Sequence, residues 1–243
     1  MISKNQIKFV KSLQNKKNRI LHKSFVVEGT KNVLELIRSD YRLLHLFGTK
    51  EWVDNNLENQ NLDFYEVNSR ELSRMSGFKN ASSVIAVFDM NLVSKNTSYG
   101  NINVVLDDIR DPGNLGSIIR TCDWFNVNKI YCSENSVDVY NPKVLQSTMG
   151  SISRVNVEYV KLKNLLHDLP SQIPVYGSFL DGDCLSNVNF SSPCFIVFGN
   201  ESKGISSEIS DLITHRVTIP GGSHMNSLNV SVSAGIMLNK LVN

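Results

Sequence analysis

Three blocks near the C-terminal end of the chain have residue types that could hold a small polar ligand. They span residues 195–204, 217–222 and 227–235. The first predicts a buried strand that ends in a glycine turn, the second a short strand stopped by Pro220, and the third a loop that leads into a helix. Because strand ends and a helix start converge at the ligand sites of open α/β sheets, the blocks predict a site of backbone amides and carbonyls. Each block alone is also compatible with an ordinary turn.

A second group of candidate residues follows the tight turn at residues 111–113. Asn114 can cap the helix that begins there, and the amide N-terminus of that helix can attract an anion such as a phosphate. Arg120 lies on the same predicted helix among apolar residues, where an arginine needs a polar partner. Arg154 is a further candidate for binding phosphate. The alternatives are a surface arginine for Arg120 and a structural salt bridge for Arg154.

The elements that must position these residues alternate between strands and helices along the whole chain, which predicts an α/β fold. Residues 94–101 are polar and have no apolar periodicity, so they predict a linker. No proline precedes this segment, whereas all six prolines follow it. The predicted domains are therefore residues 1–96 and residues 97–243. Predicted strands span residues 24–29, 43–47, 63–67, 84–88, 103–107, 129–132 and 174–179, besides those in the three blocks.

Charge is distributed unevenly between the two predicted domains. Residues 1–100 hold 15 Lys and Arg and 10 Asp and Glu, whereas residues 101–243 hold 10 and 13. A run of cations before any acid is the electrostatic signature of a nucleic-acid contact. A solvated, poorly ordered arm is the alternative. The cations that precede the first acid are Lys4, Lys8, Lys11, Lys16, Lys17, Arg19 and Lys23.

Composition excludes several classes of protein. The chain of 243 residues is 41% hydrophobic, as expected of a globular protein with a core, and no apolar run is long enough to span a bilayer. The N-terminus lacks the hydrophobic region of a signal peptide, which predicts a cytoplasmic location. The four cysteines have no Cys-x-x-Cys spacing, so we expect reduced thiols and no metal site. The glycine-rich signatures of dinucleotide sites, nucleoside triphosphatases and α/β-hydrolases do not occur.

Three motifs in this sequence resemble those of the SpoU/TrmH family of knotted RNA ribose 2′-O-methyltransferases. Residues 111–120 resemble the first motif, residues 198–205 the second, and residues 219–235 the third. They occur in the expected order with suitable spacing. Residues 25–33 resemble part of that family's substrate-binding domain, so the resemblance covers nearly the whole chain.

The resemblance implies a fold and a cofactor. The fold is an α/β trefoil-knot methyltransferase domain preceded by a small α/β RNA substrate-binding domain, and the family is dimeric with its site at the interface. The methyl donor is S-adenosylmethionine, held in a bent shape by the knotted loops. The positions that the resemblance implies for cofactor binding are Gly199, Asn200, Ile219 and Leu228.

By the same resemblance, Arg120 acts on the ribose hydroxyl. The residues around it are Asn114, Glu201, Ser227 and Asn229. Arginine is a poor base in water because its pKa exceeds about 12. Arg120 could therefore polarise the hydroxyl, hold the neighbouring phosphate, or act as a tuned base. The candidate RNA-binding residues are Lys16, Lys17, Arg19 and Arg154.

The sequence thus predicts an enzyme that transfers a methyl group from S-adenosylmethionine to a ribose 2′-hydroxyl. Only RNA has this hydroxyl, and the separate N-terminal module favours ribosomal RNA over transfer RNA. Three alternatives stay open: a transfer RNA ribose methyltransferase, a catalytically silent RNA-binding protein of ribosome assembly, and a knotted methyltransferase that acts on a base nitrogen. A homodimer is the expected assembly, without membrane or metal partners.

Overall fold

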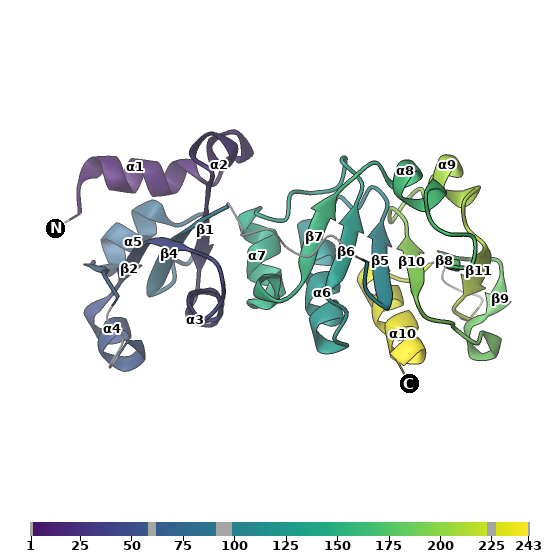
Figure 1. The fold of residues 1–243 in the computed structure, drawn as a ribbon. Coiled ribbons are helices and arrows are strands. Elements are labelled where there is room, and N and C mark those ends of the chain that lie inside the picture. Colours follow the sequence, from purple (N-terminus) through teal and green to yellow (C-terminus); the bar gives the residue numbers. More distant parts are fainter. Residues whose placement is uncertain (1, 58–61, 91–98, 223–226, 243) are drawn as a thin grey trace. The chain divides into compact units, whose positions relative to one another are not determined.

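The computed structural model describes residues 2–57, 62–90, 99–222 and 227–242, and the chain forms two compact units (Figure 1). The first unit consists of residues 1–95 together with 140–153, and the second of residues 96–139 together with 154–243. The sequence predicted one boundary near residue 97 and did not anticipate that a later segment would join the first unit. Both units contain helices and a sheet, which confirms the predicted α/β class.

The first unit is built on a mixed four-stranded sheet in the order β1-β4-β2-β3. Strand β4 pairs antiparallel with β1 and β2, and β2 pairs parallel with β3. Helices α1 and α5 pack on this sheet through a core that includes Val10, Leu13, Met75 and Ile85. The elements are α1 (Lys4–Ser12), α2 (Lys16–His22), β1 (Ser24–Glu28), α3 (Thr30–Ile37), β2 (Leu43–Gly48), α4 (Lys50–Asn56), β3 (Tyr65–Glu66), α5 (Ser69–Met75) and β4 (Val84–Asp89).

A short segment between two strands of the second unit also belongs to the first unit. It holds α7 (Pro142–Thr148) and the 3₁₀ helix η1 (Ser151–Ser153). Helix α7 contacts β1 and α3. The ring of Tyr140 lies 4.6 Å from that of Phe25, and Asn32 Nδ2 donates to Gln146 Oε1 at 3.5 Å. The first unit is therefore completed by residues 140–153, which are separated in sequence from residues 1–95 by part of the second unit.

The second unit has a seven-stranded parallel sheet in the order β7-β6-β5-β10-β8-β11-β9. All five residues of β10 are buried, as expected of a central parallel strand covered on both faces. Helices α8 and α9 pack through Leu162, Leu166 and Ile209 against Val105 and Val197 of the sheet. Helices α6 and α10 pack against each other and lie apart from α8 and α9 (Figure 1).

The elements of the second unit are, in order, β5 (Ile102–Leu106), α6 (Pro112–Trp124), β6 (Lys129–Cys132), β7 (Asn156–Tyr159), α8 (Leu162–His167), β8 (Val175–Phe179), β9 (Asp183–Cys184), η2 (Leu185–Asn187), β10 (Cys194–Phe198), α9 (Ser207–Ser210), β11 (His215–Thr218) and α10 (Val230–Val242). Of the described helices, none has the length and apolar character needed to cross a bilayer. The trefoil knot stays a prediction, and residues 223–226 of the third motif lie outside the described part of the chain.

A glycine exchange tests whether the segment at residues 140–153 supports the first unit. Gly150 has φ +94°, and a Cβ there would lie 2.6 Å from Cβ and Cγ of Glu35 on α3. We therefore expect Gly150→Ala to lower the free energy of unfolding by roughly 1–3 kcal/mol, measured by urea titration. Gly221→Ala is the matched control, because nothing lies within 4 Å of a Cβ there. Equal stability of the two variants would contradict the packing of this segment on α3.

Candidate functional site

Three polar side chains, one from each sequence motif, meet in the second unit. Asn114 Nδ2 donates a hydrogen bond of 2.7 Å to Glu201 Oε1, and Asn229 Nδ2 donates one of 2.9 Å to Asn114 Oδ1. Asn114 is buried, whereas Glu201 and Asn229 are exposed residues. Glu201 and Asn229 lie 87 and 115 positions from Asn114 in sequence. The fold therefore brings together three of the predicted catalytic residues.

The local structure around each member fixes its position. Asp111 caps α6 by accepting from the backbone N–H of Asn114 at 2.8 Å, and Pro112 follows in the first turn, where its missing N–H costs nothing. Asn229 Oδ1 accepts from the backbone N–H of Ser231 at 2.9 Å at the start of α10. Because the Glu201 carboxylate can only accept when it is ionised, it also fixes which way the Asn114 amide points.

In the glycine turn after β10, Gly199 lies close to the backbone of Gly204 and Ile205. A Cβ on Gly199 would lie 2.2 Å from the backbone carbon of Gly204 and 2.2 Å from the backbone nitrogen of Ile205. The family resemblance assigned Gly199 to cofactor binding. The close approach that the structure shows at this glycine is between two parts of the turn itself. A larger residue at position 199 would therefore disturb the turn whether or not a ligand is bound.

Asn200 ties this turn to the neighbouring loop. Its Nδ2 donates to the backbone carbonyl of Asp108 at 2.8 Å, and its Oδ1 accepts from the backbone N–H groups of Ser202 at 3.0 Å and Lys203 at 3.2 Å. The side chain is thus occupied by contacts within the protein. At position 200 the turn therefore offers a ligand its backbone and not its side chain, which is the kind of contact that the sequence predicts.

Arg120 lies on α6 but not in the surroundings that the sequence suggested. The apolar side chains of Ile118, Ile119 and Cys122 are buried, whereas Arg120 is exposed. The expectation that it needs a polar partner inside the protein is therefore wrong. Within the part of the chain that the structure describes, Arg120 makes no hydrogen bond or ion pair.

Comparison with known proteins decides the family. A model of the SpoU rRNA methylase family matches residues 101–239, which is more than half of the chain. The chain belongs to the SpoU rRNA methylase family. A second model, of an MRM3-like substrate binding domain, matches residues 4–86. The resemblance of the three motifs and of residues 25–33 is thereby confirmed.

Individual relatives extend over the whole chain. The 23S rRNA (guanosine(2553)-2′-O)-methyltransferase RlmP of Bacillus subtilis is 26% identical over 240 residues, which cover 97% of this chain and 96% of RlmP. A solved TrmH-family structure from Porphyromonas gingivalis is 35% identical with a TM-score of 0.87, covering 99% of this chain and 98% of its own. An AdoMet-bound rRNA methyltransferase from Sinorhizobium meliloti is 25% identical with a TM-score of 0.84, covering 99% and 95%.

The other residues that the SpoU resemblance assigned to the cofactor and the substrate lie around the end of β11 and the start of α10. Ile219 is half-buried directly after β11, and Leu228 is 51% exposed just before α10. Ser227 is exposed beside it. Residues 223–226 of the same loop lie outside the described part of the chain. The roles of these residues in binding stay predictions.

Two arginines predicted to bind RNA have structural partners instead. Arg19 is 2% exposed and donates through Nη1 to the carbonyls of Leu13 and Gln14, each at 2.9 Å, so its predicted role at an RNA surface is wrong. Arg154 donates to both carboxylate oxygens of Asp123, with distances of 2.8–3.0 Å. The salt bridge that the sequence left as an alternative is therefore present. Lys16 and Lys17 of α2 are exposed, and their contact with RNA stays a prediction.

The cysteines of this SpoU-family chain are mostly buried. Burial raises the pKa of Cys132 to about 12 and that of Cys194 to about 11, and it raises the pKa of Cys122 still further. These thiols stay protonated at neutral pH, so they are poor nucleophiles and poor metal ligands. In the described ranges, no three His, Cys, Asp or Glu side chains are grouped so that they could hold a metal ion.

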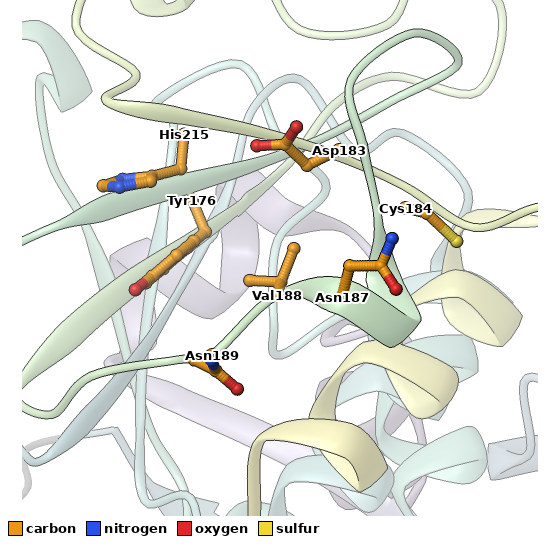
Figure 2. Close-up of a pocket in the computed structure, with 7 residues that line it drawn as sticks. All are labelled: Tyr176, Asp183, Cys184, Asn187, Val188, Asn189 and His215. Atoms are coloured by element: carbon orange, nitrogen blue, oxygen red, sulfur yellow. The ribbon is translucent and has the colours of Figure 1, made fainter.

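A pocket that the sequence did not indicate lies at the β9 edge of the sheet. Its volume is about 350 Å³ (Figure 2). Tyr176 and His215 are register partners on β8 and β11, with ring centroids 4.9 Å apart, and residues 187–189 lie across from them (Figure 2). The pocket is lined by Tyr176, Asp183, Cys184, Asn187, Val188, Asn189 and His215. None of these residues lies in the three SpoU motifs, so we do not assign this pocket to methyl transfer.

An exchange at Asn114 tests the three-residue cluster. Asn114→Asp places a carboxylate against the Glu201 carboxylate, and two carboxylates at this distance do not ionise together readily, so one pKa is raised in the folded state. A raised pKa means that the folded variant binds more protons than the unfolded chain, so its stability falls as pH rises. We expect little loss of unfolding free energy near pH 4 and about 1 kcal/mol at pH 8, because Glu201 is exposed.

The control is the double variant Asn114→Asp with Glu201→Gln, in which a glutamine amide can donate to the new carboxylate. Unfolding titrations at pH 4, 6 and 8 should show the loss in the single variant and not in the double variant. A loss independent of pH, or one that persists in the double variant, would contradict a direct contact between residues 114 and 201.

Proposed function

We propose that this SpoU-family chain transfers the methyl group of S-adenosylmethionine to a ribose 2′-hydroxyl of RNA, and that ribosomal RNA is its substrate. The observation that carries the proposal is the hydrogen-bonded cluster of Asn114, Glu201 and Asn229. Asn114 lies on the same helix as Arg120, which is exposed and has no partner among the residues that the structure describes. The names of the similar proteins support it, because one is a 23S rRNA 2′-O-methyltransferase and another is an AdoMet-bound rRNA methyltransferase.

The residues near the second and third motifs fit an adenosine-containing sulfonium compound. Thr218 Oγ1 donates to the carbonyl of Leu180 at 3.1 Å, so the ends of β11 and β8 lie together. Leu180 is 75% exposed and Leu228 is 51% exposed, and such apolar side chains can cover the face of a purine. A Cβ on Gly221 would meet nothing within 4 Å, so its backbone is open to a ligand.

The protein's contribution to the reaction is binding and orientation. S-adenosylmethionine supplies an electrophilic methyl group, so the chain has to align the ribose hydroxyl and accommodate its proton. We assign Gly199, Ile219 and Leu228 to the main-chain cradle. The cluster around Asn114 holds the three motif loops in one arrangement, and this rigidity keeps the reacting atoms aligned.

Arg120 acts on the RNA in this proposal. A guanidinium keeps its proton at neutral pH and presents a planar fork of donors that matches phosphate oxygens. We assign it the task of holding the phosphate next to the target ribose and donating toward the 2′-oxygen, while the hydroxyl proton leaves to solvent. Glu201 and Ser227, both exposed, complete the polar surroundings of the hydroxyl.

A homodimer is also part of the proposal. Val232 and Ile236 of α10 are 48% and 37% exposed, one turn apart on the same face of the helix. Met237 of the same helix is 0% exposed and belongs to the core, so it is not part of this surface. An apolar helix face of this kind suits a twofold contact with a second copy. The cytoplasmic location expected from the sequence stays a prediction.

The activity is tested with RNA from cells that lack the gene. Purified protein, labelled S-adenosylmethionine and separate ribosomal and transfer RNA fractions are combined, and the nucleosides are identified by mass spectrometry. We expect a 2′-O-methylated nucleoside in the ribosomal fraction. Methylation in the transfer RNA fraction alone would replace the substrate, a methylated base would replace the reaction class, and no product in either would support the catalytically silent alternative.

Arg120→Ala should then reduce the single-turnover rate by about 10²–10³-fold, the effect of removing one preorganised donor at a transition state. Cofactor affinity by calorimetry and the melting temperature should hardly change, because Arg120 is exposed and unpaired in the described structure. Arg120→Lys should recover little, since a point charge does not reproduce the fork. Arg74→Ala, at an exposed arginine of α5, is the control. A wild-type rate in Arg120→Ala would remove this residue from the mechanism.

The dimer is tested by charging its expected contact. Val232→Glu with Ile236→Glu places two carboxylates on the exposed face of α10, which should repel a second copy and strip the contact of apolar area. Light scattering at micromolar concentration should give twice the chain mass for the wild type and 27.3 kDa for the variant. Ile20→Glu with Leu21→Glu carries the same charge change on the first unit and should stay dimeric. A wild-type mass of 27.3 kDa would contradict the dimer.

A further inference from the structure

Helix α2 of the first unit exposes two large apolar side chains. Ile20 is 59% exposed and Leu21 is 70% exposed, which places them among the most exposed large apolar residues of the described chain. They lie in a segment that is otherwise cationic, with Lys16 and Lys17 before them and Lys23 after them. The charge pattern alone did not assign a task to this apolar pair.

The pair is presented by a helix that is held firmly in place. Asn18 Nδ2 donates to the carbonyl of Ser12 at 3.0 Å, and the buried Arg19 donates to the carbonyls of Leu13 and Gln14. These bonds tie α2 to the end of α1 and use the two side chains that precede Ile20. Asn15 caps the start of the helix by accepting from the N–H of Lys17 at 2.9 Å. Hydrogen bonds to the end of α1 therefore fix the orientation of the helix that exposes Ile20 and Leu21.

The segment that carries this pair holds no acidic residue, although Asp89 of β4 is the register partner of Ser24, which follows the segment. Six lysines between residues 4 and 23 are exposed, and the first carboxylate of the chain, Glu28, is 4% exposed. Glu28 accepts from Ser76 Oγ at 2.6 Å and from the N–H of Gly77 at 2.9 Å, so it faces inward. Helices α1 and α2 thus present positive charge that attracts a polyanion.

The spacing of residues along α2 places each exposed apolar side chain next to a lysine. Lys16 and Ile20 are four residues apart, as are Lys17 and Leu21, and such pairs lie side by side on a helix with Cβ atoms about 5–6 Å apart. Each apolar side chain therefore has a cation one turn away. A strand of RNA with unstacked bases offers phosphates and base faces together, whereas a duplex offers phosphates with its base faces stacked inside.

We infer that α2 is a contact for unpaired nucleotides of RNA, with Lys16 and Lys17 on phosphates and Ile20 and Leu21 on exposed base faces. This inference rests on the proposed function, because it presumes an RNA substrate. It assigns to the first unit a preference for loops or single strands over regular duplex. A surface that bound RNA through lysines alone would have no such preference.

The test compares two labelled probes with the full-length protein by fluorescence anisotropy. One probe is a 20-nucleotide RNA without secondary structure, and the other is an RNA duplex with the same number of phosphates. Ile20→Gln with Leu21→Gln keeps the charge and the helix propensity while removing the apolar surface. We expect this variant to bind the single strand about tenfold more weakly, as the loss of two partly buried side chains implies, and the duplex with nearly unchanged affinity.

Two control variants separate the apolar contact from charge and from unspecific effects. Lys16→Gln with Lys17→Gln should weaken both probes and reduce the slope of log affinity against log salt by about 0.7 per lost contact on the single strand. The apolar variant should leave that slope unchanged. Phe64→Gln removes another exposed apolar side chain of the first unit, next to the acid Asp63, and should leave both affinities unchanged. Melting curves confirm that each variant is folded.

The remaining outcomes decide against the inference or against its premise. Equal affinity of the apolar variant and the wild type for the single strand would overturn it, and so would equal losses on both probes. Vesicles of phosphatidylserine and phosphatidylcholine are titrated in parallel. Loss of vesicle binding in the apolar variant, with unchanged RNA binding, would assign the surface to a membrane instead. A wild-type protein that binds neither probe would instead refute the proposed RNA substrate itself.

Discussion

The carboxamide of Asn114 is the contact on which the arrangement of the site depends. It donates to Glu201 and accepts from Asn229, so a single planar group joins the loops of all three motifs. Its burial makes either bond costly to lose, because an unpaired amide would be left away from water. Each loop is also fixed by its own contacts, such as the Asn200 bonds to the Asp108 carbonyl and to two backbone N–H groups.

The parallel sheet explains why these loops can meet at all. Strands β5 and β10 are neighbours, with Leu106 in register with Phe198, so the chain leaves both strands at the same edge. Asp107 then accepts through Oδ2 from the N–H of Ser206 at 2.8 Å and links the two loops directly. Helix α10 packs on α6. A Cβ built on Gly235 would lie 3.8 Å from Thr121 Cγ2 of α6, so the two helices are close at this glycine. The strand order thus brings the loops together, and hydrogen bonds between their side chains then fix how they are arranged.

Sequence patterns predicted the strands with continuous apolar runs, because full burial leaves a local signal. They missed β7, whose four residues are only half-buried, and β9, which has two residues, since edge strands of this kind depend on a neighbour for their existence. They also placed residues 140–153 with the second domain, although Tyr140 and Gly150 pack against Phe25 and Glu35 of the first unit. Packing between segments that are so distant in sequence leaves no periodic pattern of residues from which it could be predicted.

The arginines and lysines also show the limit of prediction from sequence, because charge alone does not say which cations are paired within the protein. Arg19 and Arg154 were grouped with the lysines as RNA ligands because charge was the available signal, yet both guanidinium forks are engaged by oxygens of the protein, two carbonyls in one case and a carboxylate in the other. A planar group with five donors suits such partners, whereas a lysine ammonium is strongly hydrated, and the six lysines between residues 4 and 23 are all exposed. Arg120 is exposed and unpaired in the described structure, but so is Arg74 of α5, so exposure alone does not distinguish it. What distinguishes Arg120 is its place on the helix that carries Asn114, a member of the cluster that joins the three motifs, and this place makes it a candidate to bind the substrate.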